Sequence, residues 1–246
     1  MKLPITLKTY LGAILLILTA TGIIRIGISK TLPQLSIALI TCITVDLTIN
    51  YYKKKKLILP DSSIITAFFI ATTLSIGQPW YIPIIAGTTA ILSKHIIKIK
   101  NRHIFNPAVF GLAVVMLLFN SVIEWWASSP LWLVIIFGIF LIYKMKNYYL
   151  IFSFFLTSTI ISLLYHLIKK TEITYGILFF SINFFFMMFM LVEPMTSPFR
   201  KKGKMIYGIL TALVSFAAII IIPQYDNSII ALIVANLFVP LLNKLR

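Results

Sequence analysis

The chain has 246 residues, of which 60% are hydrophobic and only 11% are charged, and its mean hydropathy is +1.00. Such a chain lacks the polar surface that a soluble globule of this size needs, so the composition predicts an integral membrane protein. The net charge of +16 does not predict nucleic-acid binding, because the basic residues adjoin long apolar runs. In that setting the expected contacts are membrane lipid headgroups or an acidic partner.

Ten apolar segments follow one another along the chain, each about long enough to cross ~30 Å of hydrocarbon, although the sixth is short. They cover residues 9–28, 32–52, 62–78, 80–98, 104–123, 130–143, 147–168, 173–192, 204–222 and 227–243. Ten crossings use ~200 residues, which leaves short connections and a single transmembrane domain, 1–246. The first segment begins like a signal peptide, but its apolar run continues to Ile28, so we interpret it as a retained helix.

Basic residues are concentrated in alternate gaps between these segments. With the N-terminus inside, the outer gaps hold only Arg25, Lys30, Lys169 and Lys170. The inner gaps hold the other 18 of the 22, namely Lys2, Lys8, Lys53, Lys54, Lys55, Lys56, Lys94, Lys98, Lys100, Arg102, Lys144, Lys146, Arg200, Lys201, Lys202, Lys204, Lys244 and Arg246. Because cytoplasmic loops are enriched in Lys and Arg, this distribution predicts a multi-pass protein of the plasma membrane with both termini cytoplasmic.

The natural division of the chain falls near residues 124–130, between a first half of about 9–123 and a second half of about 130–243. Each half has five crossings, an odd number, so two similar halves must run in opposite directions through the bilayer. The predicted fold is therefore all-α and polytopic, with about ten transmembrane helices in two inverted five-helix halves.

Asp46 lies inside the second segment, seven residues before Lys53 and hence ~10 Å from it along a helix axis. A charged group at mid-membrane costs about 2.5–3.5 kcal/mol on insertion scales, so one that persists usually faces protein, water or a ligand. Two interpretations stay open for Asp46. It pairs with a neighbouring helix for stability alone, or it takes part in ion or proton coupling.

Five further polar residues are expected at one depth near the inner side, where helices begin or end: Asp61, Lys94, Asn106, Glu193 and Asn236. Prolines beside them at 107, 194 and 198 cannot donate backbone hydrogen bonds, so these helix ends leave polar backbone groups free. Such ends suit an anionic or heterocyclic ligand. The alternative is ordinary capping of helix ends at the membrane interface.

The other notable residues have structural interpretations. Cys42 is the one cysteine, so the chain forms no internal disulfide and no cysteine-ligated iron–sulfur cluster. The Phe-rich stretch 179–186 is interpreted as lipid-facing and helix-packing surface. Four Trp residues lie near the predicted outer boundaries and are interpreted as interface anchors: Trp80, Trp125, Trp126 and Trp132. The three histidines are interpreted as interfacial polar residues: His95, His103 and His166.

Ordered motifs over about residue 35 to the end resemble a known family. The first-half motifs are Asp61-Ser62-Ser63-Ile64-Ile65-Thr66, Pro79-Trp80, Lys94, and Phe105-Asn106-Pro107-Ala108 with Gly111. The second-half motifs are Glu193-Pro194-Met195-Thr196-Ser197-Pro198, Gly203-Lys204, Tyr207-Gly208 and Asn236-Leu237-Phe238-Val239-Pro240-Leu241. They resemble the signatures of the NqrB/RnfD family, whose members are membrane components of the sodium-pumping NADH:quinone reductase and of the Rnf electron transport complex.

The resemblance implies a membrane subunit of a redox-driven ion pump, which passes electrons through flavin. It places Asp61, Thr66, Lys94, Asn106, Glu193, Thr196 and Asn236 at the cofactor and Asp46 at the ion or proton path, and it suggests no catalytic residue or metal ligand. Members attach FMN covalently through a Ser-x-Ala-Thr-like motif after helix five. This chain is shortened there and has no such motif, so we expect noncovalent FMN or riboflavin, or a flavin held by a partner.

The expected partners are other membrane subunits and a cytoplasmic flavoprotein or ferredoxin-type reductase, because the chain has no dinucleotide-binding fold of its own. Two other functions stay open on the sequence. One is an inverted-repeat solute transporter or channel without redox activity. The other is a noncatalytic scaffold that anchors a reductase through its basic inner face.

Overall fold

The computed structural model of the chain describes residues 6–55, 61–99, 102–170 and 182–245. Helices dominate these residues. The named strands among them, β1 (Lys98–Ile99) and β2 (Arg102–His103), form a small antiparallel hairpin. The chain divides into two compact units, Met1–Phe137 and Gly138–Arg246, with the boundary inside helix α6 (Leu131–Met145). We describe each unit by itself.

Several helices are suited to a membrane by their length and composition. Within the described ranges, four are long and apolar enough to span it: α1 (Leu7–Ile26), α2 (Ile28–Lys54), α7 (Tyr148–Lys169) and α9 (Lys201–Ile221). Helices α5 (Pro107–Phe119), α6 and α10 (Asn227–Leu242) are shorter and also apolar. The prediction of an all-α polytopic membrane protein is confirmed.

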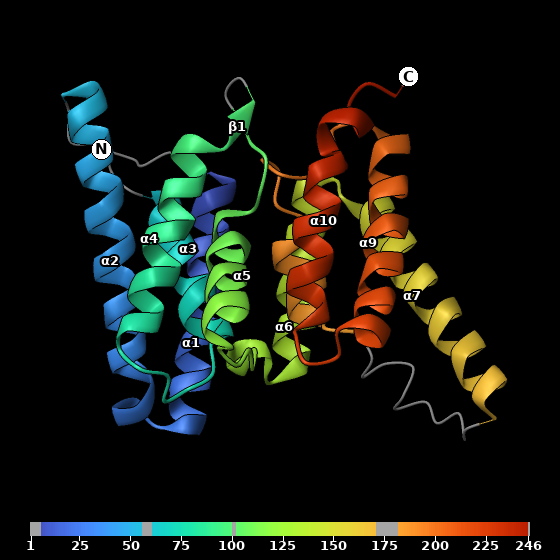
Figure 1. Cartoon of the computed structure of the whole chain (residues 1–246), viewed down its shortest axis with the longest axis horizontal. Coiled ribbons are helices and arrows are strands. Elements are labelled where there is room, and N and C mark those ends of the chain that lie inside the picture. Colours follow the sequence, from blue (N-terminus) through green and yellow to red (C-terminus); the bar gives the residue numbers. More distant parts are fainter. Residues whose placement is uncertain (1–5, 56–60, 100–101, 171–181, 246) are drawn as a thin grey trace. The chain divides into compact units, whose positions relative to one another are not determined.

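Helix α3 (Asp61–Thr73) forms the centre of the first unit (Figure 1). It packs against α1, α2, α5 and α4 (Tyr81–Ile96). Every residue of α3 from Thr66 to Thr73 is buried, as expected for a helix that is surrounded on all sides. A single residue, Gly27, joins α1 to α2; its φ of 110° lies in the region that favours glycine.

The third and fifth predicted segments are not continuous helices, so their expected bounds of 62–78 and 104–123 are wrong. Helix α3 ends at Thr73, after which Leu74 forms an isolated β-bridge with Ile123. Helix α5 occupies only Pro107–Phe119. Extended pairing replaces the helical hydrogen bonds at this point, since the Ser75 amide donates to the Val122 carbonyl over 3.0 Å. Such backbone is tolerated at membrane depth where protein buries it.

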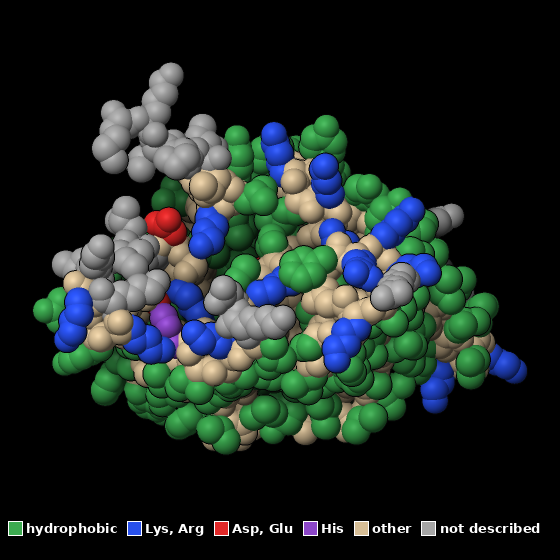
Figure 2. All heavy atoms as spheres, turned by 90° about the horizontal axis from the view of Figure 1, so that it is seen from above, with side chains coloured by type: hydrophobic (Ala, Val, Ile, Leu, Met, Phe, Trp, Pro, Cys, Tyr) green, Lys and Arg blue, Asp and Glu red, His purple; other side chains and the backbone are tan. Residues whose placement is uncertain are grey.

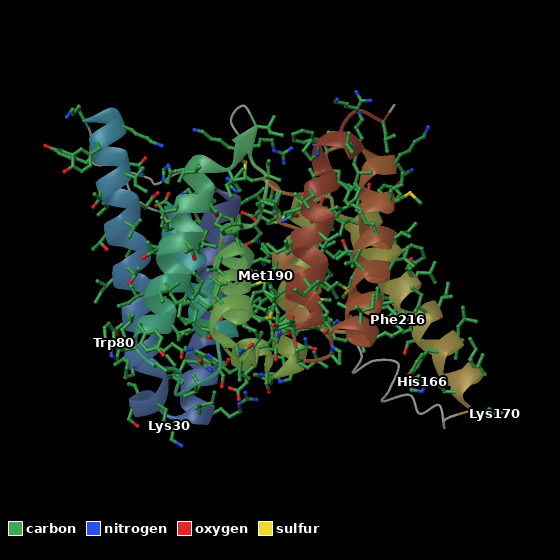
Figure 3. The ribbon with its side chains drawn as sticks, viewed as in Figure 1. Lys30, Trp80, His166, Lys170, Met190 and Phe216 are labelled. Atoms are coloured by element: carbon green, nitrogen blue, oxygen red, sulfur yellow. The ribbon has the colours of Figure 1, made fainter. Side chains whose placement is uncertain are left out.

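A short loop containing the 3-10 turn η1 (Trp126–Ser128) covers the end of α3. Trp125 and Trp126 are buried there, so the interpretation of these two as interface anchors is wrong. Trp80 and Trp132 are 68% and 61% exposed, as an anchor requires. In Figure 3, Trp80 and Lys30 lie at the same end of the first unit.

In the second unit, α9 packs against both α7 and α10. Small residues permit this close approach. A Cβ atom added at Gly208 would meet the Ser153 hydroxyl and, at 2.5 Å, the Leu150 carbonyl of α7. One added at Gly203 would lie 2.9 Å from the Leu242 carbonyl of α10. Contacts of this kind are typical of helix packing in membranes.

Part of the predicted segment 173–192 lies outside the described residues. Its described end contains the π-helical turn η2 (Phe186–Met190), in which the Leu191 amide donates to the Phe186 carbonyl over 3.0 Å. Phe185, Phe186 and Phe189 are each 1% exposed. These phenylalanines are therefore buried by protein, and the lipid-facing part of the interpretation is wrong for Phe185 and Phe186.

Candidate functional site

The first unit buries a cluster of charged and hydroxyl side chains from three helices, α2, α3 and α4. Asp46 is eight residues before the end of α2, so it lies roughly 12 Å below that end along the helix axis. Ser62 and Ser63 are in the first turn of α3, and Lys94 and His95 are in the last turn of α4. We call these five residues the Asp46 cluster.

The Asp46 cluster is joined by short polar contacts. The Lys94 ammonium lies 3.2 Å from Asp46 Oδ1 and also donates to Ser62 Oγ over 2.6 Å and to Ser63 Oγ over 3.2 Å. His95 Nε2 lies 2.7 Å from the same carboxylate oxygen. Asp46 Oδ1 therefore has two basic partners, and the Lys94 ammonium has three oxygen partners.

Burial makes these contacts important for the fold. The Asp46 side chain is only 3% exposed, whereas those of Lys94 and His95 are 16% and 14% exposed. Taking a carboxylate out of water costs several kcal/mol unless a counter-charge and hydrogen bonds replace the lost hydration. Of the two open interpretations of Asp46, pairing with a neighbouring helix is seen directly, and a role in ion or proton coupling stays a prediction.

Close packing of α2 on α4 brings the cluster together. Gly87 of α4 faces α2: a Cβ atom added there would lie 3.1 Å from Cys42 Sγ and 3.2 Å from the Thr41 methyl. Lys94 and His95 follow Gly87 by about two helical turns, and Asp46 follows Cys42 by one, so both sets of residues extend toward the same end. Figure 2 looks onto this end of the unit, where Lys and Arg side chains gather.

Three predicted residues of the first unit lie near this end in different surroundings. Asp61 is exposed at the first position of α3. Thr66 is buried and donates to the Ser62 carbonyl over 2.9 Å. Asn106 is buried and caps α5, because its Oδ1 accepts from the Val109 amide over 3.1 Å. The capping interpretation thus describes what Asn106 does in this structure.

The second unit holds two polar pairs, of which one is partly buried and the other fully buried. The Thr196 hydroxyl donates to Glu193 Oε2 over 3.1 Å, and Thr196 is 1% exposed. The Tyr207 hydroxyl of α9 donates to Asn236 Oδ1 of α10 over 2.6 Å, and both side chains are fully buried. Asn236 Nδ2 has no hydrogen-bond partner among the described residues. Such an amide is a donor that lacks an acceptor.

Sequence reasoning missed four members of these groups. From the sequence, His95 reads as an interfacial polar residue, Ser62 and Ser63 as an ordinary helix start, and Tyr207 only as part of a motif. The signal for Tyr207 is a phenol in the middle of an apolar span, which needs a hydrogen-bond partner when it is buried. The expected layer of five polar residues is divided between the two units, and its common depth stays a prediction.

The described residues show no group of three or more His, Cys, Asp or Glu side chains that could hold a metal ion. The oxygen atoms of the Asp46 cluster come from one carboxylate and two hydroxyls. The single negative charge of the carboxylate balances one positive charge.

Comparison with models of protein families identifies a family for the chain. A model of the NQR2, RnfD, RnfE family matches the chain twice, over residues 6–130 and 126–246. The two matches together cover nearly the whole chain and meet at the division near residues 124–130 that the sequence suggests. The comparison with curated proteins gives no significant match.

Proposed function

Because the chain belongs to the NQR2, RnfD, RnfE family, we propose that it is the membrane subunit of a redox-driven, ion-translocating electron transport complex. The family is associated with membrane subunits of such complexes. The Asp46 cluster carries the proposal for this chain. Ion movement coupled to electron transfer needs a charge inside the membrane whose partners can change, and Asp46 in α2 has two basic partners from another helix.

We propose that electrons pass through a flavin, FMN or riboflavin, that this chain holds noncovalently or meets on a partner. When bound, the flavin supplies one- and two-electron transfer, while the protein positions it. The orphan Asn236 Nδ2 supports this choice, since it offers a hydrogen bond to a carbonyl or ring nitrogen acceptor. Glu193 and Thr196 are the other contacts that we propose in this unit. In the first unit we propose, separately, Asp61, Thr66, Lys94 and Asn106 as residues that contact a flavin.

Two observations support noncovalent binding. The sequence has no Ser-x-Ala-Thr motif. The short loop at 124–129 is also engaged in packing, because the Trp126 indole donates to the Ala71 carbonyl over 2.7 Å and the Arg25 guanidinium donates to the Trp126 carbonyl over 2.9 Å. A loop that covers the end of α3 in this way has a structural role. We therefore assign no residue of this loop to covalent attachment of a flavin.

The proposed partners are further membrane subunits and a cytoplasmic flavoprotein or ferredoxin-type reductase. The basic end of the first unit supports an acidic partner on that side, as its exposed residues include Lys53 and Lys98. The described elements are helices and one small hairpin, so oxidation of a nicotinamide would belong to the partner.

The test is the absorption spectrum of the complex purified from membranes, followed by acid extraction. We expect a flavin band that a reductant bleaches and a flavin that acid releases from the chain. Asn236→Leu should lower the flavin content, whereas the control Asn50→Leu in α2 should not. A complex that yields no flavin and shows no bleaching with its reductase would refute the electron-carrying role.

An inverted-repeat transporter or channel remains the second candidate, and one observation favours it. Helix α3 ends at Thr73 and gives way to extended backbone, and helices interrupted in this way are common where transporters bind solutes. This function predicts stabilisation of the purified chain by a particular solute, with no visible chromophore. A flavin-free spectrum combined with such stabilisation would select it over the redox subunit.

A further inference from the structure

Three side-chain oxygens of the Asp46 cluster converge on one cationic nitrogen. Asp46 Oδ1 lies 3.2 Å from the Lys94 ammonium, Ser62 Oγ lies 2.6 Å from it, and Ser63 Oγ lies 3.2 Å from it. The carboxylate comes from α2 and the two hydroxyls from α3, while the ammonium reaches them from α4. The nitrogen thus occupies the centre of a set of oxygen ligands that two other helices supply.

We propose that these oxygens form a binding site for a small monovalent cation, and that the Lys94 ammonium is a tethered competitor for it. The proposal rests on the proposed ion-translocating function and names the cation site and its regulation. Carboxylate and hydroxyl oxygens are the ligands that hard cations prefer. One carboxylate balances one positive charge, so an alkali cation can replace the ammonium without changing the net charge of the site.

The structure indicates which partner moves. Asp46 is short, 3% exposed and inside a 27-residue helix, so its carboxylate is held in place. Lys94 has a long flexible side chain, is 16% exposed and lies two residues before the end of α4. Its ammonium can therefore swing toward the membrane surface, in the way that lysines near helix ends keep their charge in water.

His95 gives the site a second link to the carboxylate. Its Nε2 lies 2.7 Å from Asp46 Oδ1, so we expect the carboxylate to keep this partner on α4 when Lys94 leaves. A buried carboxylate without a full counter-charge carries a penalty of several kcal/mol. We therefore expect the cation to enter as the ammonium leaves.

The opposite arrangement is an anion site formed by Lys94, His95 and the start of α3, with Asp46 as the tethered competitor. The geometry disfavours it, because the group that would have to leave is the shorter and more deeply buried one. The experiment below separates the two.

The experiment measures thermal unfolding of the purified full chain in detergent, in NaCl, KCl, LiCl or choline chloride at equal ionic strength. Lys94→Gln keeps a polar side chain of similar length but removes the competitor. We expect one alkali cation to raise its midpoint by about 3–6 °C over choline at ten times the dissociation constant. The wild type and the exposed-lysine control Lys98→Gln should change far less.

The same shift should vanish in Lys94→Gln combined with Asp46→Asn, and shrink when Ser62→Ala and Ser63→Ala are added. A midpoint of Lys94→Gln that is equal in alkali chloride and choline chloride would overturn the proposal. So would a shift that persists without the Asp46 carboxylate, or stabilisation of Asp46→Asn by chloride or phosphate, which would indicate the anion site.

If Lys94→Gln does not fold, the wild type supplies the second measurement. Labelling by an amine-reactive reagent, read by mass spectrometry, should increase at Lys94 as Na⁺ replaces choline and stay constant at Lys98. Unchanged labelling of Lys94 up to molar Na⁺ would overturn the proposal. Flavin content is measured separately. A chain that holds flavin but shows no cation effect refutes only the cation site. A chain that shows the cation effect but holds no flavin refutes only the electron-carrying role.

Discussion

The indole Nε1 of Trp126 donates to the carbonyl of Ala71 over 2.7 Å, and these residues are 55 positions apart in the sequence. The bond satisfies one of the last carbonyls of α3, which have no partner within the helix. The Gln34 side chain of α2 donates to the same carbonyl over 2.8 Å and to that of Leu74 over 3.0 Å. The end of the central helix is thus closed by side chains from two other parts of the unit.

Trp126→Ala should destabilise the chain by about 3–5 kcal/mol, because it removes a large buried side chain and leaves a cavity. Trp126→Phe keeps most of the packing and should cost less, about 0.5–1.5 kcal/mol, since Gln34 still donates to Ala71. Thermal unfolding in detergent measures both. Trp132→Ala is the matched control, as Trp132 is 61% exposed. An equal loss of stability in that variant would contradict the structural role of Trp126 at the end of α3.

Much of the fold follows from the sequence, but the ends of α3 and α5 do not. Hydropathy predicts the apolar runs, and the bounds of α7 lie within one residue of the predicted segment 147–168. Hydropathy cannot show that the run 62–78 leaves the helix at Thr73, because the apolar residues Leu74 and Ile76 continue the run beyond the helix end. The break is stabilised by distant partners, Ile123 and Trp126, which a local pattern does not contain.

Gly208→Ala should destabilise the second unit by about 1–3 kcal/mol, the usual cost of inserting an extra methyl group into a packed contact. The new Cβ would meet the Ser153 hydroxyl and the Leu150 carbonyl, so α7 and α9 would have to separate. The control is Gly12→Ala in α1, where a Cβ meets nothing within 4 Å. That variant should be neutral or stabilised by up to about 1 kcal/mol, since alanine favours the helix. Equal effects in thermal unfolding would count against the close contact.

Tyr207→Phe should cost about 1–3 kcal/mol, because it leaves Asn236 Oδ1 buried without its donor. Asn236→Leu should be less costly in the Tyr207→Phe background than alone, since the two residues share one hydrogen bond. A double-mutant cycle by thermal unfolding measures this coupling, with Tyr143→Phe as the control, as Tyr143 is 77% exposed. Additive losses would mean that the 2.6 Å contact contributes nothing to stability.

The sequence predicts which charged residues belong to the candidate site, but it does not predict the contacts between them. Asp46 and Lys94 stand out in the sequence because charges are rare inside apolar spans. Their pairing depends on how closely α2 approaches α4, and that approach depends on Gly87 facing Cys42. His95 cannot be told from an interfacial histidine until the helix face is known. Side-chain partners across helices need the packing, which the pattern of one chain does not supply.

The orientation of the chain can be tested through α2, whose ends carry Lys30 and Lys53. The charge distribution predicts Lys53 inside and Lys30 outside. Single cysteines are placed at these positions in a Cys42→Ala background; the native cysteine is buried. An impermeant maleimide applied to intact cells should label Lys30→Cys, whereas Lys53→Cys should react only after the membrane is opened. The reverse result would invert the topology, and labelling of both sites from outside would mean that α2 does not cross the membrane.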